Sequence, residues 1–124
     1  FNTAHWNHDF DNPASKAFVE AFRKEYGRTP SIYAAQAFDV MMMIDTAVRE
    51  VKGKVDNRDA VRAALKKASF KSVRGDFRFG HNQFPIQDFW LRVIRKDGNE
   101  INNRSLSKVM EKHVDAYAAQ CQMK

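Results

Sequence analysis

Apolar residues recur at helical spacing between Thr29 and Gly53, in the longest regular pattern of the chain. Thr29 suits the N-cap of a helix, Pro30 suits its first turn, and Gly53 suits the left-handed residue that follows a helix. We therefore predict one long, mostly buried helix over about residues 30–52, around which the rest of the chain packs. The apolar side chains on its predicted buried face are Tyr33, Ala37, Val40, Met41, Ile44, Ala47, Val48 and Val51.

The polar residues of this helix are expected to face away from the core. Asp39 and Asp45 are six residues apart, so at about 100° per residue their carboxylates do not converge into a catalytic pair. We interpret both as solvent-facing or capping charges. The apolar run from Val40 to Ile44 has five residues, whereas a membrane-spanning helix needs about 20. The segment is therefore predicted to be a core helix and not a membrane span.

Two shorter helices are predicted on either side of the long one. The first covers about residues 13–26, because Asn12 suits its N-cap and Gly27 suits its end. The second covers about residues 57–68, where alanines, a valine and a leucine recur every three or four positions. A short connector over residues 27–30 joins the first of these helices to the long one, so we expect those two to be neighbours in space.

The remaining regular patterns indicate strands. Polar and apolar residues alternate between Gly75 and Gly80, which predicts a short strand with Phe77 and Phe79 on one face. Residues 86–96 form the strongest predicted strand. Because this strand carries apolar side chains on both faces, we expect it to be an inner strand or one covered on both sides.

The C-terminal region is predicted to return on that strand and then to become helical. A tight turn at Asp97 and Gly98 leads into a short strand over residues 100–103. From Ser105 onward, several side chains recur at helical spacing and predict a C-terminal helix. They are Leu106, Val109, Met110, His113, Tyr117 and Cys121. Together these elements predict an α/β fold.

Composition and charge narrow the class of protein. The 124 residues are 44% hydrophobic and 12% aromatic, which supports one small packed domain and argues against disorder. The formal net charge is +6. A basic chain is compatible with nucleic-acid binding, but we interpret the lysines and arginines as a solvated surface because they are spread along the sequence and not massed.

Candidate catalytic and metal-binding groups are sparse. Phosphate-binding, nucleotide-binding, serine-hydrolase and zinc-protease motifs are absent from the sequence. Four side chains near the N-terminus could be metal ligands, but their spacing fits no zinc pattern and we interpret them as a surface loop: His5, His8, Asp9 and Asp11. His113 and Cys121 lie eight residues apart near a terminus, which is a poor arrangement for a base and a nucleophile. We predict no catalytic residue, metal or cofactor.

Residues across nearly the whole chain resemble the C-terminal third of the solute-binding proteins of branched-chain amino-acid-type ABC importers. The family pattern is approximately F-x-x-x-Y-x-x-x-P, then Y-x-A-x-x-[YF]-D-A, then a basic helix, then G-x-F-x-F. The matching residues are Phe22, Tyr26, Pro30, Tyr33, Ala35, Phe38, Asp39, Gly75, Phe77 and Phe79. The sequence DAYAAQC near the end also resembles one branch of this family. One departure is Val40, where the family usually has alanine.

The resemblance implies an incomplete type I periplasmic-binding-protein fold, in which two α/β lobes joined by three crossovers close on a ligand. Residues 1–84 would belong to the first lobe and residues 85–124 to the second, with Phe84 and Pro85 at the hinge. Tyr33, with Ile32 beside it, matches the place where the family offers an aromatic or apolar side chain to the ligand.

The resemblance also implies a function. The protein would be a non-enzymatic, extracytoplasmic solute-binding protein that captures an amino acid or a related carboxylate, aromatic acids included, for an ABC-transporter permease. The chain would then be a piece of a longer protein. A small basic nucleic-acid-binding domain and a small enzyme using His5 and His8, or His113 and Cys121, remain as alternatives. We also expect the chain alone to self-associate, because the strand over residues 86–96 would lack its cover.

Overall fold

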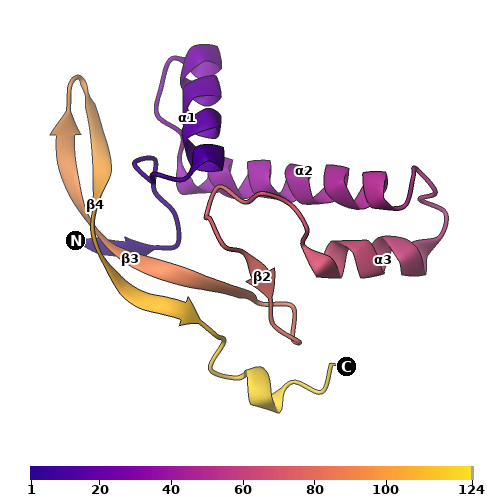
Figure 1. Cartoon of the computed structure of the whole chain (residues 1–124). Helices are drawn as coiled ribbons and strands as arrows, with labels where there is room; N and C mark the ends of the chain where they lie inside the picture. Colours follow the sequence, from indigo (N-terminus) through magenta and orange to yellow (C-terminus); the bar gives the residue numbers. More distant parts are fainter. Residues whose placement is uncertain (124) are drawn as a thin grey trace.

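The computed structural model describes residues 1–123 of the chain. Within that range the chain folds into α-helices, a small antiparallel sheet and a C-terminal 3₁₀ turn, so the predicted α/β class is confirmed (Figure 1). The elements, in chain order, are β1 (Asn2–Ala4), α1 (Pro13–Tyr26), α2 (Ile32–Glu50), α3 (Arg58–Lys67), β2 (Arg78–Phe79), β3 (Pro85–Asp97), β4 (Glu100–His113) and the 3₁₀ turn (Ala118–Gln120).

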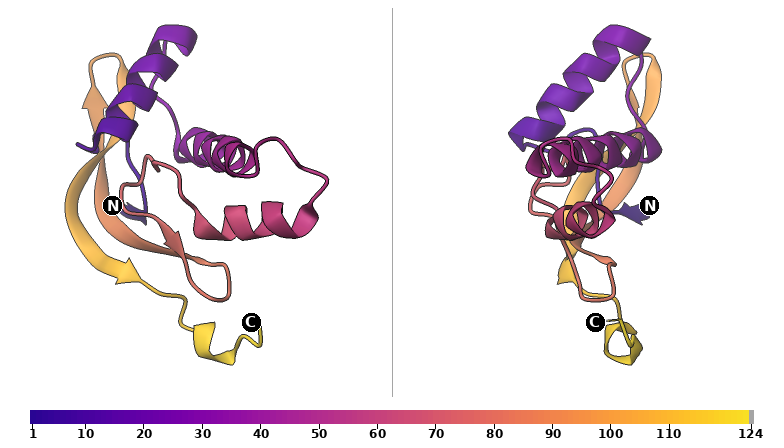
Figure 2. Two further views of the ribbon diagram at one scale, coloured as in Figure 1. Left: turned by 45° about the vertical axis from the view of Figure 1, so that its right-hand side comes forward. Right: turned by 90° about the vertical axis from the view of Figure 1, so that its right-hand side faces the viewer.

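The sheet is built around β3. This strand pairs with β4 along most of its length, with β1 at residues 90–92, and with β2 near its own start, where Arg78 lies opposite Ile86. All of these pairings are antiparallel. The β3–β4 hairpin curves past the helices, and the C-terminal turn extends away from them (Figure 2). The expectation that β3 is an inner strand is therefore confirmed.

The helix boundaries follow from local capping. The Asn12 side chain accepts a hydrogen bond from the Ser15 amide at 2.8 Å, and Pro13 needs no partner at the first position of α1. Gly27 closes α1 in the left-handed conformation, with φ of 65°. The Asn57 side chain caps α3 in the same way as Asn12 caps α1. Both short helices lie where the sequence predicts them.

The predicted cap of α2 is wrong by two residues. Ser31, not Thr29, is the N-cap, and its hydroxyl accepts a hydrogen bond from the Ala34 amide at 3.3 Å. The Thr29 hydroxyl instead accepts a hydrogen bond from Arg23 Nη2 at 3.1 Å and donates to the Glu100 carboxylate, so it is engaged away from the start of α2. Gly53 does adopt the predicted left-handed conformation, with φ of 76°, although α2 already ends at Glu50.

The predicted buried face of α2 is also mostly wrong. Ala47 is buried as expected, but the side chains of Tyr33 and Met41 are 77% and 63% exposed. The buried face instead carries Ala35 and Asp39, each about 1% exposed. The helix is thus rotated relative to its apolar stripe, because Asp39 makes buried hydrogen bonds that are described below.

A small core lies where α1, α2 and the loop after β1 meet. Trp6 and Phe18 pack edge to face with ring centroids 5.8 Å apart, and Phe18 stacks on Phe38 at 4.7 Å. The Trp6 indole donates a hydrogen bond to the buried Ser15 hydroxyl at 2.9 Å, which satisfies both polar groups. Val73, on the segment after α3, completes the same cluster.

The predicted C-terminal helix from Ser105 is wrong, because β4 continues to His113 before the chain turns. Three register shifts interrupt its pairing with β3, between Gln87 and Arg92. Such irregularities break the two-residue alternation of a strand. The resulting pattern of apolar residues in β4 imitates helical spacing, which explains the wrong prediction.

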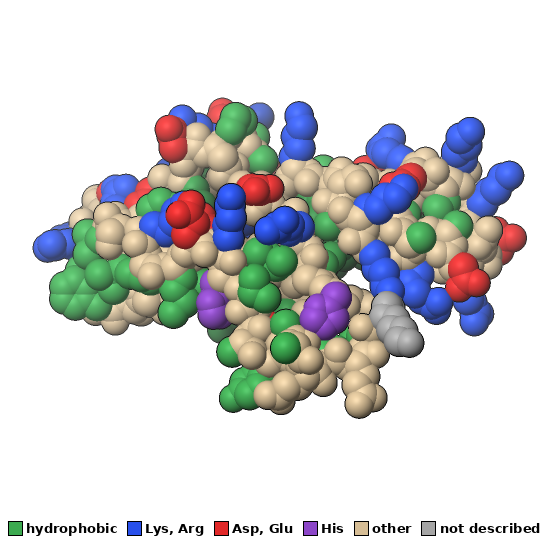
Figure 3. Space-filling view, turned by 60° about the horizontal axis from the view of Figure 1, so that its bottom comes forward, with side chains coloured by type: hydrophobic (Ala, Val, Ile, Leu, Met, Phe, Trp, Pro, Cys, Tyr) green, Lys and Arg blue, Asp and Glu red, His purple; other side chains and the backbone are tan. Residues whose placement is uncertain are grey.

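The surface is uneven in charge. Lysine and arginine side chains gather at the end of the molecule formed by the turn between α2 and α3 (Figure 3). In the described part of the chain, no helix combines the length and apolar character needed to cross a membrane.

Candidate functional site

A hollow of about 250 Å³ opens beside the N-terminal end of α2. Three segments that are far apart in the sequence form it: the loop after β1, the connector between α1 and α2 with the first residues of α2, and the paired strands β3 and β4. Its lining residues are Trp6, Asn7, His8, Thr29, Pro30, Ser31, Ile32, Tyr33, Arg92, Ile101, Asn102 and Asn103. The hollow therefore combines apolar side chains with cationic and amide groups.

The loop after β1 is held in place by β4. The Asn7 side-chain amide donates to the Asn103 carbonyl and to the Ser105 hydroxyl, each at 3.1 Å. The Asp9 carboxylate accepts hydrogen bonds from the Ser105 amide and hydroxyl at 2.9 and 2.7 Å. His8 Nε2 lies 3.0 Å from the Asn103 carbonyl oxygen. These contacts give the wall of the hollow a defined geometry.

The same contacts shift the pKa values of Asp9 and His8. Burial raises the pKa of the Asp9 carboxyl, but the hydrogen bonds from Ser105 and Asn7 outweigh it, so the pKa lies below its ordinary value. Burial lowers the pKa of His8 below its ordinary value, although Asp9 and the Asn103 carbonyl oppose this shift. At neutral pH the wall therefore offers a neutral imidazole at His8, while the Asp9 carboxylate holds the loop to β4 behind it.

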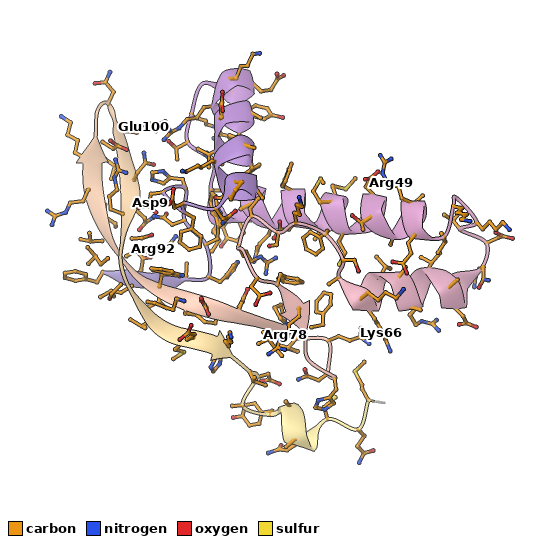
Figure 4. All side chains as sticks on the ribbon, viewed as in Figure 1. Asp9, Arg49, Lys66, Arg78, Arg92 and Glu100 are labelled. Atoms are coloured by element: carbon orange, nitrogen blue, oxygen red, sulfur yellow. The ribbon has the colours of Figure 1, made fainter. Side chains whose placement is uncertain are left out.

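Arg92 is the cation of the hollow. Its Nε donates to the Asn2 side chain at 2.9 Å and its Nη1 donates to the Trp6 carbonyl at 3.2 Å, so β1 and the following loop orient the guanidinium (Figure 4). Burial lowers the pKa of Arg92, and the Asp9 charge opposes this shift. A guanidinium that is held in this way suits recognition of a carboxylate.

The hairpin turn is joined to the connector before α2. Glu100 accepts hydrogen bonds from the Thr29 amide at 3.2 Å, from the Thr29 hydroxyl, and from the Asn102 side chain at 3.0 Å. The hydrogen bond from the Thr29 hydroxyl is the main reason that the pKa of Glu100 falls to about 2. Asn102 also reaches the Thr29 hydroxyl at 3.4 Å. This clasp, defined as Thr29, Glu100 and Asn102, borders the hollow.

The structure places both predicted ligand-binding residues at the hollow. Ile32 and Tyr33 are the first two residues of α2, and the exposed Tyr33 ring is free to meet a ligand. The predicted hinge residues lie elsewhere: Phe84 is 60% exposed, and Pro85 begins β3 opposite Phe79. The sequence reasoning missed Arg92, which it identified only as one of many basic residues and as a polar position within a strand.

A second polar cluster joins α2 to β3, and its centre is Asp39. This buried carboxylate accepts hydrogen bonds from the Ser72 hydroxyl at 2.6 Å, the Val73 amide at 2.9 Å and Arg74 Nε at 3.0 Å. Arg74 continues to the Gln87 side chain on β3 at 3.0 Å. The interpretation of Asp39 as a solvent-facing or capping charge is therefore wrong.

The N-terminal histidines and aspartates do not gather into a metal site. His5 lies against Gln36 and the Phe89 ring, His8 lies against Asn103, and Asp11 pairs with Lys16. Among the residues that the structure describes, no three His, Cys, Asp or Glu side chains are arranged to hold a metal ion. His113 ends strand β4, and Cys121 directly follows the 3₁₀ turn. The predicted C-terminal helix that would have carried both residues is therefore not formed.

Comparisons with known proteins agree with this architecture. Residues 1–99 match a family described as periplasmic binding protein. A solute-binding protein of an ABC transporter from R. palustris, solved in complex with benzoate, is 32% identical, with a TM-score of 0.85 over 97% of this chain. One from Rhodopseudomonas palustris HaA2, solved with p-hydroxybenzoic acid, is 24% identical over 96% of this chain, with a TM-score of 0.77. A leucine-binding protein from Thermotoga maritima MSB8 is 21% identical over 82% of it, with a TM-score of 0.67.

The chain spans about a third of the length of these structures, namely 32%, 33% and 29% of the three. The two that are below 25% identity show the shared fold alone. No curated protein matches the sequence.

Proposed function

Because the chain belongs to the periplasmic binding protein family, we propose that it supplies one wall of the ligand site in an extracytoplasmic solute-binding protein of an ABC importer. The family consists of transport proteins that bind solutes and are not enzymes. The fold is a partial type I periplasmic binding fold, as the resemblance predicts. The observation that carries the proposal is the convergence of Ile32, Tyr33 and Arg92 on one hollow.

The proposed solute is a small carboxylate with an apolar or aromatic body, as in an amino acid or a benzoate. The exposed ring of Tyr33 and the side chain of Ile32 would contact the apolar body, and Arg92 would pair with the carboxylate. This follows the usual construction of small-molecule sites, in which apolar walls bury the ligand and a few polar groups orient it. The solved relative that is 32% identical, which was solved in complex with benzoate, supports the same class.

We propose that residues 1–84 belong to one lobe and residues 85–124 to the other, with Phe84 and Pro85 at the hinge. The start of β3 supports a hinge at this place, because its first residues pair with β2, beside the helices, before the strand continues into the long pairing with β4. β1 pairs with β3 at residues 90–92, so the N-terminal strand joins the same sheet as β3 and β4. Arg74 reaches β3 at Gln87, three residues beyond the proposed hinge residue Phe84, and would anchor the strand near the pivot.

The remaining proposals follow from the family. The partner would be the permease of an ABC transporter, and the location would be periplasmic or otherwise extracytoplasmic. Delivery of solute to a permease requires a binding protein on the outer side of the membrane. The family match and the transporter context of the solved relatives support both proposals.

Calorimetric titration of the full-length protein with benzoate, 4-hydroxybenzoate and leucine tests this function. We expect micromolar or tighter binding of at least one of them, and weak or no binding by the 124-residue chain alone. The chain alone would lack the other walls of the site, and affinity depends on groups that converge from several sides. Failure of the full-length protein to bind any small carboxylate would overturn the proposal.

A further inference from the structure

The charge of the chain is concentrated in one segment. Residues 49–71 contain eight lysines or arginines and three acidic residues, so they carry +5 of the net +6. The other 13 lysines and arginines lie along the rest of the chain, where 12 acidic residues nearly balance them. The eight cations are Arg49, Lys52, Lys54, Arg58, Arg62, Lys66, Lys67 and Lys71, and all are exposed. We refer to these eight residues as the basic end.

The basic end presents unneutralised charge. Three of its cations pair with carboxylates: Arg49 with Asp45, Arg62 with Asp59, and Lys67 with Glu50. For the other five, no carboxylate within the described residues lies within ion-pair distance. These five are Lys52, Lys54, Arg58, Lys66 and Lys71. A surface with this much free positive charge attracts an anionic partner.

The cations of the basic end are distributed over α3 and the turn after α2, where Lys54, Arg62 and Lys66 also line hollows of the surface. Arg58, Arg62 and Lys66 follow one another at four-residue steps, so they form a row on one face of α3. That row extends for about 12 Å along the helix. The turn after α2 adds Lys52 and Lys54, and the cations gather on this end of the molecule in the surface view (Figure 3).

The composition of the basic end distinguishes a lipid surface from a protein partner. Protein interfaces are enriched in aromatic residues and arginine and depleted in lysine. Here five of the eight cations are lysines, and Val55 is the one large apolar side chain among described residues 49–71 that is strongly exposed, at 57%. Flexible lysine ammonium groups suit the diffuse phosphate charge of lipid headgroups and do not need a fixed partner geometry.

The basic end is also remote from the ligand hollow. The 19 residues of α2 extend for about 28 Å, with the hollow at the N-terminal end and the basic end at the C-terminal end. Arg49 and Lys66 lie at one end of the molecule in Figure 4, whereas Arg92 and Glu100 lie at the other. Contact at the basic end would leave the hollow open.

We propose that the basic end is a docking surface for an anionic phospholipid membrane. It would hold the protein reversibly at the membrane surface, with the Val55 side chain at the contact. Each lysine or arginine near an anionic membrane raises binding by about fivefold, so several together produce measurable but salt-sensitive association. The assignment rests on charge placement and does not depend on which solute the protein binds.

Co-sedimentation of the full-length protein with vesicles tests the assignment. We expect binding to vesicles of phosphatidylglycerol and phosphatidylcholine, none to pure phosphatidylcholine, and a steep loss with added salt. The triple variant Arg58→Glu, Arg62→Glu and Lys66→Glu should bind about a hundredfold more weakly. The matched control is Lys24→Glu, Arg28→Glu and Lys96→Glu, which makes the same charge change at exposed positions outside the basic end. It should bind nearly as well as the wild type.

Two outcomes would overturn the proposal. If the wild type ignores phosphatidylglycerol vesicles at low salt, the basic end does not dock to lipid, and an acidic protein surface becomes the better occupant. If both triple variants lose binding equally, the effect is one of net charge and not of this surface. Circular dichroism of each variant checks folding. The salt titration of the wild type keeps the proposal testable even if a variant does not fold.

Discussion

The two faces of α2 are buried and exposed in the reverse of what their residue types would suggest. One face buries a carboxylate, Asp39, in contact with Ser72, Val73 and Arg74. The other face leaves large apolar side chains such as Met41 exposed. The comparison teaches that a helix is oriented by the polar groups it must satisfy as well as by its apolar stripe. Leaving a buried polar group unpaired costs more than leaving one apolar side chain in water.

We expect the largest effect when the buried carboxylate of Asp39 is removed. Asp39→Ala should lower the free energy of unfolding by about 3–5 kcal/mol, because it leaves the Arg74 charge and the Ser72 hydroxyl buried without their partner. The matched control is Asp45→Ala on the exposed side of α2, whose ion pair with Arg49 is worth at most about 1 kcal/mol. Denaturant unfolding measures both. Equal effects would show that Asp39 does not orient the helix.

The exposed face is tested by association. We expect the 124-residue chain to self-associate through this face, and Met41→Lys with Ile44→Lys to weaken that association by about a hundredfold. Glu20→Lys on α1 is the surface control. The sequence led us to expect self-association because the strand over residues 86–96 would lack a cover. That argument is weakened by the structure, since β3 is paired with β4 along most of its length. Light scattering after size exclusion decides the matter, and a monomer at every concentration would contradict the prediction.

A smaller effect concerns His5, which lies beside the buried side of α2 near Gln36. Burial is the main reason that its pKa falls from 6.5 to about 4, and the charges of Arg74 and Arg92 lower it further. Below pH 6.5 the unfolded chain takes up a proton at His5 that the folded chain does not. Stability that is fully present above pH 6.5 should therefore be lost as the pH falls toward 4.

We expect this loss to be on the order of 1–2 kcal/mol, given the partial exposure of the ring. His5→Gln should flatten the pH dependence of the melting temperature between pH 6.5 and 4. His81→Gln, at an exposed position, is the control for loss of a histidine as such. A His5→Gln curve that is parallel to the wild type would show that the imidazole stays accessible to protons.

Local signals in the sequence predicted much of the fold. The cap Asn12, the glycine after α1 and the strand around Trp90 are properties of a few adjacent residues, and the structure confirms each of them. The partial type I fold followed from the resemblance and is likewise confirmed.

The errors arose where a distant segment decides the outcome. The Thr29 hydroxyl is directed to Glu100, 71 residues later in the chain, and Ser72 and Arg74 hold Asp39 in the interior. The bulged pairing of β4 with β3 removes the alternation by which a strand is recognised. None of these contacts leaves a signal within one helical turn of the residue it affects.

The candidate site was predictable in part for the same reason. Ile32 and Tyr33 came from a motif, and the structure places both at the hollow, although their contact with a ligand remains a prediction. Arg92 could not be singled out, because its orientation depends on Asn2 and on the Trp6 carbonyl, some 90 residues earlier in the chain.

The most direct test of the account is to measure ligand affinity and melting temperature together for Tyr33 variants of the full-length protein. Tyr33 lies on the exposed face of α2, so Tyr33→Ala should leave the melting temperature nearly unchanged. It should weaken binding of the carboxylate that the protein prefers by about 10- to 100-fold, and Tyr33→Phe should retain most of the affinity because the ring is kept. A large fall in melting temperature with unchanged affinity would contradict the account and would make Tyr33 a structural residue outside the ligand site.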